Sequence, residues 1–235
     1  MQNPNLSYSM DQTQVQLRIG TFVRSVYNWM AIGLALTGLV AYFVAHTPAL
    51  KSIAMTGFYL FIIAELILVF TLSARIGKMQ PSTATAMFVG YAILNGVTLS
   101  IFFAIYAKAL IASTFFICAL MFAGLSIFGW VTKKDLTGVG NFMFMGLIGI
   151  LIASVVNIFI QSSGMQMIIS YIGVLVFAGL TAYDTQTIKH MALSQPAGTS
   201  AGVVRKGAII GALKLYLDFI LMFQFLLTIL GGNRD

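Results

Sequence analysis

Seven apolar runs, each about as long as a bilayer is thick, dominate this sequence. They lie at about 27–45, 53–74, 84–107, 110–131, 141–160, 167–187 and 208–230. A helix that crosses the hydrocarbon core needs about 20 apolar residues. The runs are continuous and do not alternate with polar residues, which argues against barrel strands. The sequence therefore predicts an all-α integral membrane protein with seven transmembrane helices in a lipid bilayer.

The composition agrees with this interpretation. The chain is 59% hydrophobic and only 8% charged, whereas soluble domains are about 25% charged. A water-exposed surface cannot be made from so few charges. The net charge of +7 would suit a nucleic-acid-binding protein, but the cations stand singly between apolar runs, as loop charges of a multi-pass protein do. We therefore expect no nucleic-acid partner.

The organisation of the chain is simple. Residues 1–24 are polar and contain neither an apolar core nor a cleavage-type sequence, so we expect no removable signal peptide. The sequence predicts a polar N-terminal segment, 1–24, and a single seven-helix transmembrane domain, 25–235. The one cysteine, Cys118, lies inside an apolar run, so neither a disulfide nor a metal cluster is expected. Nothing in the sequence calls for a cofactor or defines a metal-ligand set.

Lysine and arginine in the connections predict the orientation, because cytoplasmic loops carry an excess of both. If the N-terminus is inside, the outside segments hold three cations, Lys51, Lys108 and Arg234, and the inside segments hold nine. We therefore predict a cytoplasmic N-terminus, and seven spans then put the C-terminus outside. The nine inside cations are Arg18, Arg24, Arg75, Lys78, Lys133, Lys134, Lys189, Arg205 and Lys206.

Four charged residues fall inside the apolar runs: Glu65, Asp184, Lys214 and Asp218. Asp218 is ten residues past Ala208, which is roughly 15 Å along a helix and near mid-membrane. A short carboxylate at that depth must face a partner or water inside the bundle. Asp184 lies nearer the end of its span than Asp218 does, and it follows an uncharged apolar run, 169–178.

The two aspartates lie on consecutive antiparallel spans and can approach each other. Two carboxylates in a low dielectric do not both ionise easily, so we expect Asp184 to be hydrogen-bonded to a protonated Asp218 with a shared proton. Lys214 is one turn from Asp218 and could instead form an internal ion pair with it. Glu65 either lines the same polar interior or pairs with Lys214.

Several segments resemble the Bax inhibitor-1 family, also called the transmembrane Bax inhibitor motif family. GLTAYDTQTIKHM (179–191) resembles its sixth-helix signature, and KLYLDFI (214–220) resembles its last-helix motif. TKKDLTGVGNFMFMGLIGI (132–150) and VYNWMAIGLALTG (26–38) also fit. The resemblance covers the chain from about residue 20 onward, and the compact loops are similar to the bacterial branch.

This resemblance implies a bundle in which two three-helix layers surround a central C-terminal helix. It implies a pH-sensitive calcium leak, with an aspartate pair as pH sensor and gate; by motif match these are Asp184 and Asp218. An arginine near the inner end of the second span, matched by Arg75, would latch the closed state by bonding to the sixth-span aspartate. Glu65 matches an acidic position of some relatives. For a bacterial member we expect the cell inner membrane.

Two positions depart from the family pattern. Relatives usually carry a small hydroxyl residue where Lys214 stands, and asparagine where Leu221 stands. A cation one turn from Asp218 changes the charge balance of the pair and repels Ca²⁺. The departures therefore bear on the operating pH and on calcium permeation itself.

Three alternative functions are open. Some bacterial relatives bind and regulate a membrane-bound protease, which needs only an interaction surface. Intramembrane aspartyl proteases also use an aspartate pair that shares a proton, but they carry GxGD at the second aspartate, where this chain has LYLD (215–218). A retinal protein would use Lys214, yet residues 84–107 contain no carboxylate as counter-ion. We therefore expect no enzymatic activity, and protease regulation is the main alternative to a leak.

Overall fold

The structure is a computed structural model that describes residues 4–196 and 198–232, with side chains from residue 16 onward. All regular structure in these residues is helical. The helices are α1 (Pro4–His46), α2 (Pro48–Thr56), α3 (Phe58–Arg75), α4 (Pro81–Leu99), α5 (Phe102–Ile105), α6 (Lys108–Val131), α7 (Thr137–Ile160), α8 (Ser163–Leu193) and α9 (Ala201–Gly231). Seven helical stretches of this described part are long and apolar enough to cross a membrane: α1 from Gln16 onward, α3, α4 continued by α5, α6, α7, α8 and α9. The predicted all-α class with seven spans is confirmed.

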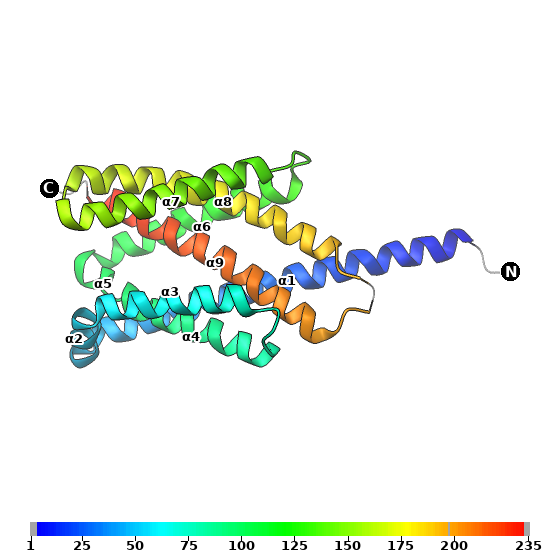
Figure 1. The fold of residues 1–235 in the computed structure, drawn as a ribbon, viewed down its shortest axis with the longest axis horizontal. Helices are drawn as coiled ribbons and strands as arrows, with labels where there is room; N and C mark the ends of the chain where they lie inside the picture. Colours follow the sequence, from blue (N-terminus) through cyan, green and yellow to red (C-terminus); the bar gives the residue numbers. More distant parts are fainter. Residues whose placement is uncertain (1–3, 197, 233–235) are drawn as a thin grey trace.

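Six of the spans form two layers on either side of α9 (Figure 1). In one layer α4 packs against both α1 and α3, and in the other α8 packs against both α6 and α7. α9 crosses diagonally between the layers and contacts α1 and α4 on one side and α6 and α8 on the other. The arrangement of two three-helix layers around a central C-terminal helix is therefore confirmed.

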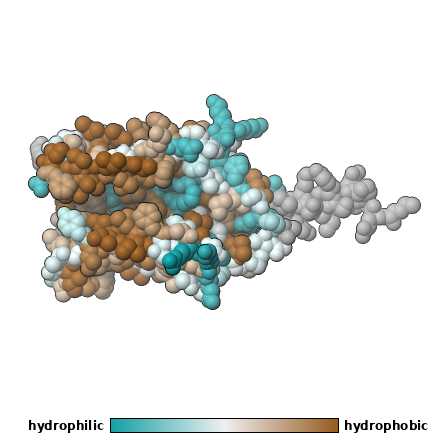
Figure 2. Space-filling view, viewed as in Figure 1, coloured by the Kyte–Doolittle hydropathy of each residue, from teal (hydrophilic) through white to brown (hydrophobic). Residues whose placement is uncertain are grey.

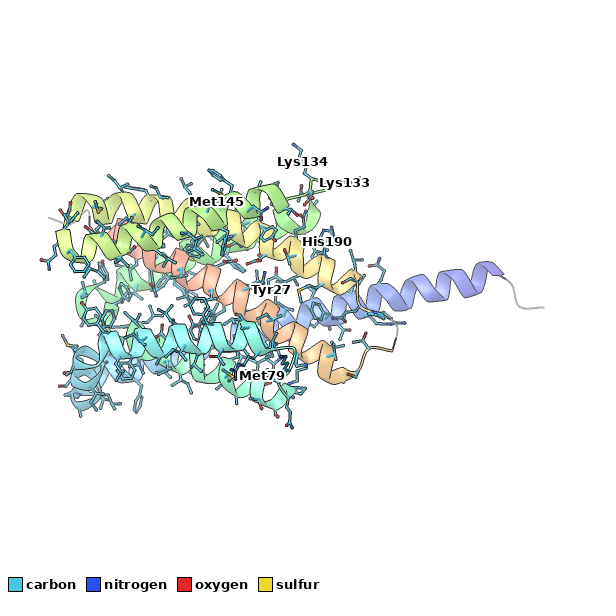
Figure 3. All side chains as sticks on the ribbon, in the orientation of Figure 1. Tyr27, Met79, Lys133, Lys134, Met145 and His190 are labelled. Atoms are coloured by element: carbon cyan, nitrogen blue, oxygen red, sulfur yellow. The ribbon has the colours of Figure 1, made fainter. Side chains whose placement is uncertain are left out.

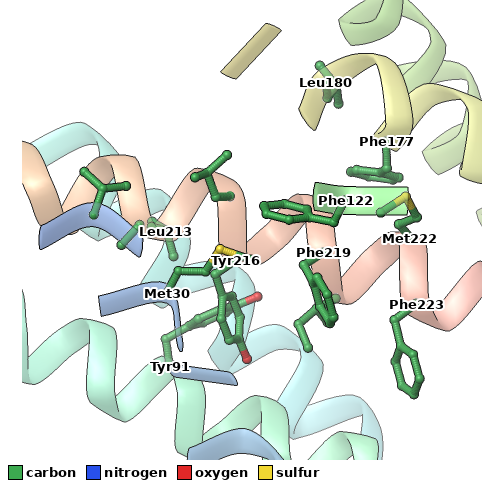
Figure 4. Close-up of a cluster of buried hydrophobic side chains, with 14 of the residues drawn as sticks. Met30, Tyr91, Phe122, Phe177, Leu180, Leu213, Tyr216, Phe219, Met222 and Phe223 are labelled. Atoms are coloured by element: carbon green, nitrogen blue, oxygen red, sulfur yellow. The ribbon is translucent and has the colours of Figure 1, made fainter. Parts of the chain in front are cut away.

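α9 is, with α8, the most buried of the candidate spans in the described part of the chain. Half of the most apolar stretch of α9 is buried (50%, as in α8), against 6% in α3 and 11% in α7, although α3 and α7 are more apolar. Figure 4 shows Tyr216, Phe219, Met222 and Phe223 of α9 in this core, together with Phe122 of α6. The burial of α9 explains why its few polar side chains must find partners within the protein.

One polar contact ties α9 to the first layer. The Thr37 hydroxyl of α1 donates to the Ala92 carbonyl of α4 at 2.8 Å, and the Tyr216 hydroxyl lies 2.7 Å from the Thr37 oxygen. Because the Thr37 proton is used on the carbonyl, Tyr216 is the donor in the second bond. Three helices are thereby joined at one buried point.

The boundaries differ from the predicted runs at two places. The run 53–74 is divided at Gly57, where α2 ends and α3 begins. The run 84–107 is interrupted at 100–101, between α4 and α5. Both breaks, at Gly57 and at 100–101, lie in apolar stretches, so the hydropathy of the sequence does not predict them.

Polar surface gathers at one end of the molecule. Lys133 and Lys134, on the connection between α6 and α7, lie at the same end as His190 (Figure 3). α1 continues beyond the bundle at this end, and the two termini lie at opposite ends of the fold (Figure 1). The viewed face is hydrophilic near this end and hydrophobic over most of the rest (Figure 2). The orientation was predicted from the unequal distribution of lysine and arginine between the connections at the two ends. The orientation itself stays a prediction.

Candidate functional site

The two aspartates of the apolar runs meet in one cleft between α7, α8 and α9. The cleft has a volume of about 370 Å³ and is lined by Asp184 of α8 and by Lys214 and Asp218 of α9. The viewed face is hollowed between the two layers, and hydrophilic residues lie in the hollow (Figure 2). The remaining lining residues are Gly140, Asn141, Phe144, Leu147, Phe177, Leu180, Tyr183, Leu217 and Leu221.

Asp184 is paired with a cation. Lys214 Nζ donates to Asp184 Oδ1 at 2.9 Å, across the interface between α9 and α8. The Asp184 side chain is 11% exposed and the Lys214 side chain is 38% exposed, so the carboxylate lies deep and the ammonium nearer the mouth. We expected a protonated Asp218 as the partner of Asp184, and Lys214 takes that place instead. The long lysine stem makes this possible, because it reaches the neighbouring helix while its backbone stays on α9.

Asp218 is the least satisfied group of the site. It is only 3% exposed, and its buried Oδ2 has no hydrogen-bond partner among the described residues. The alternative pairing of Lys214 with Asp218, one turn apart on α9, is not formed in this conformation, because the ion pair of Lys214 is with Asp184. A buried carboxyl oxygen without a partner is rare and costly. A change in the protonation of Asp218 would therefore alter the hydrogen bonding and charge of the cleft directly, because no partner compensates this carboxyl oxygen.

The signature around Asp184 also anchors the turn between α6 and α7. The Gln186 amide donates to the Lys134 carbonyl at 2.9 Å, and its Oε1 accepts from the Leu136 backbone N–H at 2.9 Å. Lys189 Nζ donates to the Trp130 carbonyl at 2.7 Å. These bonds fix the start of α7, which forms one wall of the cleft. Sequence reasoning missed Gln186, although a glutamine two residues from an intramembrane aspartate is itself a polar residue that needs partners.

Tyr183 is a second residue that sequence reasoning did not assign to the site. Its ring packs on Gly140 of α7, where an added Cβ would lie 2.5 Å from the ring. Gly140 and Tyr183 both line the cleft. A side chain at position 140 would therefore displace the Tyr183 ring, so glycine is required there for close packing.

Glu65 lies in a neighbouring cleft rather than with Lys214. Thr98 donates to Glu65 Oε1 at 2.8 Å and Asn95 donates to Oε2 at 3.2 Å, so both carboxylate oxygens are bonded by α4. This second cleft has a volume of about 320 Å³, and it shares two lining residues with the aspartate cleft, Leu217 and Leu221. Glu65 therefore lines a separate cleft rather than the interior that contains the two aspartates, and it does not pair with Lys214.

Comparison with known proteins identifies the family. Residues 19–235 match the family described as "Inhibitor of apoptosis-promoting Bax1". The chain belongs to the Bax inhibitor-1 family. It is 46% identical to the Inner membrane protein YbhL of Escherichia coli K12 over 225 residues, which cover 94% of this chain and 96% of YbhL. It is 42% identical to a protein of Deinococcus radiodurans over 227 residues, which cover 97% and 96% of the two chains.

The latch that the Bax inhibitor-1 resemblance implies is not closed here. Arg75 is the last residue of α3 and is exposed, whereas the Asp184 oxygen that would receive it is occupied by Lys214. In this structure a lysine of the central helix, Lys214, bonds the aspartate to which the resemblance assigns an arginine of α3. The role of Arg75 stays a prediction.

The described residues of this Bax inhibitor-1 protein hold no group of three or more histidine, cysteine and acidic side chains that could enclose a metal ion. The aspartate cleft offers two carboxylates, whereas Ca²⁺ takes six to eight oxygen ligands. A cation in the cleft would keep most of its water.

Proposed function

We propose that this protein is a pH-sensitive leak channel for Ca²⁺ or a similar cation, gated by a proton that Asp184 and Asp218 share. The observation that supports the proposal is the meeting of both carboxyls in one cleft within the spans, with Asp218 Oδ2 unpaired. Intramembrane carboxylates that face the interior of a bundle mark ion pathways and proton relays.

We further propose that the protein resides in the cell inner membrane, as the name of its relative YbhL states for that protein. The N-terminus would be cytoplasmic and the C-terminus outside. The excess of cations in the predicted inner connections supports this orientation, as does the position of Lys133 and Lys134 at the polar end of the molecule (Figure 3).

The charges of the cleft predict whether the cation flux rises or falls with pH. The cleft contains two carboxyls and one ammonium. If one carboxyl carries the shared proton, the charges cancel; if that proton is lost, one negative charge is uncompensated. A cleft with net negative charge attracts a divalent cation far more than a neutral one does. Cation flux should therefore rise as the pH rises through the titration of the pair.

The position of the pair explains how protonation would reach the rest of the molecule. Lys214 joins α9 to α8 through Asp184, and α9 packs against helices of both layers. A shift of α9 relative to α8 would change the packing on both sides. Gating then needs two conformers with different affinities for the proton.

Calcium flux into proteoliposomes loaded with a calcium-sensitive dye tests the proposal. Wild type, Asp184→Asn and Asp218→Asn would be compared from about pH 5.5 to 8, a range in which folded proteins are usually near their maximal stability. We expect a flux in wild type that rises with pH, and a flux without that pH dependence in both variants. Asp135→Asn is the matched control, because Asp135 is exposed on the connection before α7.

A wild-type flux equal to that of empty liposomes at every pH would overturn the proposal. A flux whose pH profile persists in Asp218→Asn would remove the gate from the pair but keep the leak. In the first case, regulation of a membrane-bound protease becomes the function to test, by co-purification from native membranes.

A further inference from the structure

A large apolar groove lies on the opposite side of α9 from the aspartate cleft. Its volume is about 740 Å³, which is within the range of about 300–1,000 Å³ typical of small-molecule sites. α1 and α6 form its walls, and Phe219, Ile220 and Phe223 of α9 form its floor. At 3.6 residues per turn these three positions face away from Lys214 and Asp218, so the groove and the cleft are separate.

The length of the groove matches one leaflet of a bilayer. Its α1 wall runs from Ala31 to Tyr42, a rise of roughly 16 Å at 1.5 Å per residue. The hydrocarbon core is about 30 Å thick, so the groove spans about half of it. Small residues make the hollow: Gly38 and Ala112 both line it, and a Cβ at Gly38 would meet nothing within 4 Å.

The groove is open toward the lipid. Leu39 and Phe116 line it from opposite walls, and their side chains are 69% and 68% exposed. At this depth of a bilayer the surroundings are acyl chains, and a polar ligand would have to leave water to enter. Hydrocarbon is therefore the occupant that the walls fit.

A cation stands at one end of the groove. Lys108 begins α6 and lines the groove, and its Nζ donates to His46 Nε2 at 2.9 Å. His46 Nδ1 is 2.7 Å from the Tyr42 carbonyl, so the ring proton is on Nδ1 and Nε2 is the acceptor. An ammonium has three donors, and two of those of Lys108 remain. Among the described side chains, the one ion pair lies elsewhere, between Lys214 and Asp184.

We propose that this groove binds one anionic phospholipid, with an acyl chain between α1 and α6 and the phosphate on Lys108. The apolar length, the lateral opening and the cation at the level of the headgroup each match one part of such a lipid. A lysine near the membrane surface attracts anionic lipid headgroups, and in the orientation proposed above Lys108 would hold a headgroup of the outer leaflet. The proposal does not depend on the leak activity, because the groove and the aspartate cleft lie on different faces of α9.

Native mass spectrometry of the full chain tests the proposal, with phosphatidylglycerol and phosphatidylcholine as probes. We expect wild type to retain one phosphatidylglycerol about fivefold more tightly than phosphatidylcholine, the preference that one lysine near the headgroup typically gives. Lys108→Gln should reduce the binding of phosphatidylglycerol to that of phosphatidylcholine. Lys51→Gln is the matched control, because Lys51 lies in α2 near the end of α1 and does not line the groove.

A second pair of variants tests the acyl-chain site. Gly38→Leu fills the groove and should weaken the binding of both lipids. Gly149→Leu is its control, because a Cβ at Gly149 of α7 also meets nothing within 4 Å and lies outside the groove. If Gly38→Leu does not fold, as judged by its helical melting curve, Ala112→Leu fills the groove from the other wall.

Two results would overturn the proposal. Equal binding of the two lipids by wild type, or unchanged binding in Lys108→Gln, would show that Lys108 does not hold a headgroup. A wild-type dimer that Gly38→Leu converts to a monomer would show that the groove receives a second copy of the chain instead.

Discussion

Two neighbouring clefts that share Leu217 and Leu221 of α9 hold carboxylates in different ways. In the cleft between α7, α8 and α9, Asp184 is balanced by the ammonium of Lys214 at 2.9 Å and Asp218 keeps an unpaired oxygen. In the cleft between α3, α4 and α9, Glu65 is held by a hydroxyl and an amide of α4, which are neutral donors. The first cleft therefore contains charges of both signs, whereas the second contains a single carboxyl group.

Under the proposed function, this difference would make the aspartate pair the sensor and Glu65 a residue that only lines the path. A proton gained or lost in the first cleft changes which groups attract one another, and so changes the contact between α8 and α9. A proton gained or lost by Glu65 changes the charge of its cleft but leaves both donors on the same helix, α4. We therefore expect gating to follow the first cleft and conduction to depend on both.

Removing the cation should have the largest effect. Lys214→Met leaves the aspartate cleft without its positive charge, so cation flux near neutral pH should rise about tenfold, the effect of about 1.4 kcal/mol in electrostatic attraction. The unpaired Asp184 should also lower stability by about 1–2 kcal/mol, less than for a fully buried pair, because Lys214 is 38% exposed. Dye flux in proteoliposomes and thermal melting measure the two effects.

Lys133→Met is the control for this variant, because Lys133 is an exposed cation outside the spans. It should change neither flux nor melting. If Lys214→Met lowers the flux instead, the ammonium is part of the conducting state and the difference between the two clefts has been misassigned.

Joining the two clefts should have the next largest effect. Leu217 and Leu221 line both of them, and hydrophobic constrictions hinder ions by excluding water. Leu221→Asn places an amide on this shared wall, so the flux should rise about threefold while its pH dependence is kept. Leu221→Met, which keeps the wall apolar, is the control. An unchanged flux in Leu221→Asn would mean that ions do not pass between the clefts.

The seven spans were predictable because they follow from length and hydropathy alone. The central position of the last helix came from the family resemblance, and the unbroken apolar character of 208–230 agrees with it. The division at Gly57 was not predictable, since one glycine in an apolar run is also compatible with an intact helix.

Three members of the candidate site were predictable but their pairing was not, and two further candidates, Arg75 and Glu65, lie outside the cleft. Intramembrane charges are few, so Asp184, Lys214 and Asp218 stood out from the sequence. Which carboxylate receives Lys214 depends on the rotation of α9 relative to α8, because the i, i+4 spacing describes a single helix only. Gln186 and Tyr183 were missed because their partners lie in the segment 130–140, and the sequence around Asp184 does not show which other segment packs against it.

Neutralising the second cleft should have a smaller effect. Glu65→Gln keeps an oxygen that can accept from Thr98 or Asn95 and removes the charge. Cation flux should fall about twofold, as for one charged residue lining a path, and the pH profile should keep its shape. Proteoliposome flux at several pH values measures both. A pH profile that flattens in Glu65→Gln would make Glu65 part of the sensor and would remove the distinction between the clefts.

The exposed carboxylate Asp135 should show the smallest effect, and only on stability in acid. The Thr137 hydroxyl and backbone N–H both donate to its Oδ1, the latter at 2.9 Å, and these bonds hold the pKa of Asp135 below its usual range. A depressed folded-state pKa means that the stabilisation is complete above the ordinary aspartate pKa of about 3.9 and is lost as the pH falls through the depressed value. Asp135→Asn should therefore melt slightly earlier than wild type at neutral pH, and the difference should vanish in strong acid. Its calcium flux should keep the wild-type pH profile, since a carboxylate outside the spans is separated from both clefts. A changed flux profile would mean that titration outside the membrane contributes to gating, and that the two buried clefts are not sufficient to explain it.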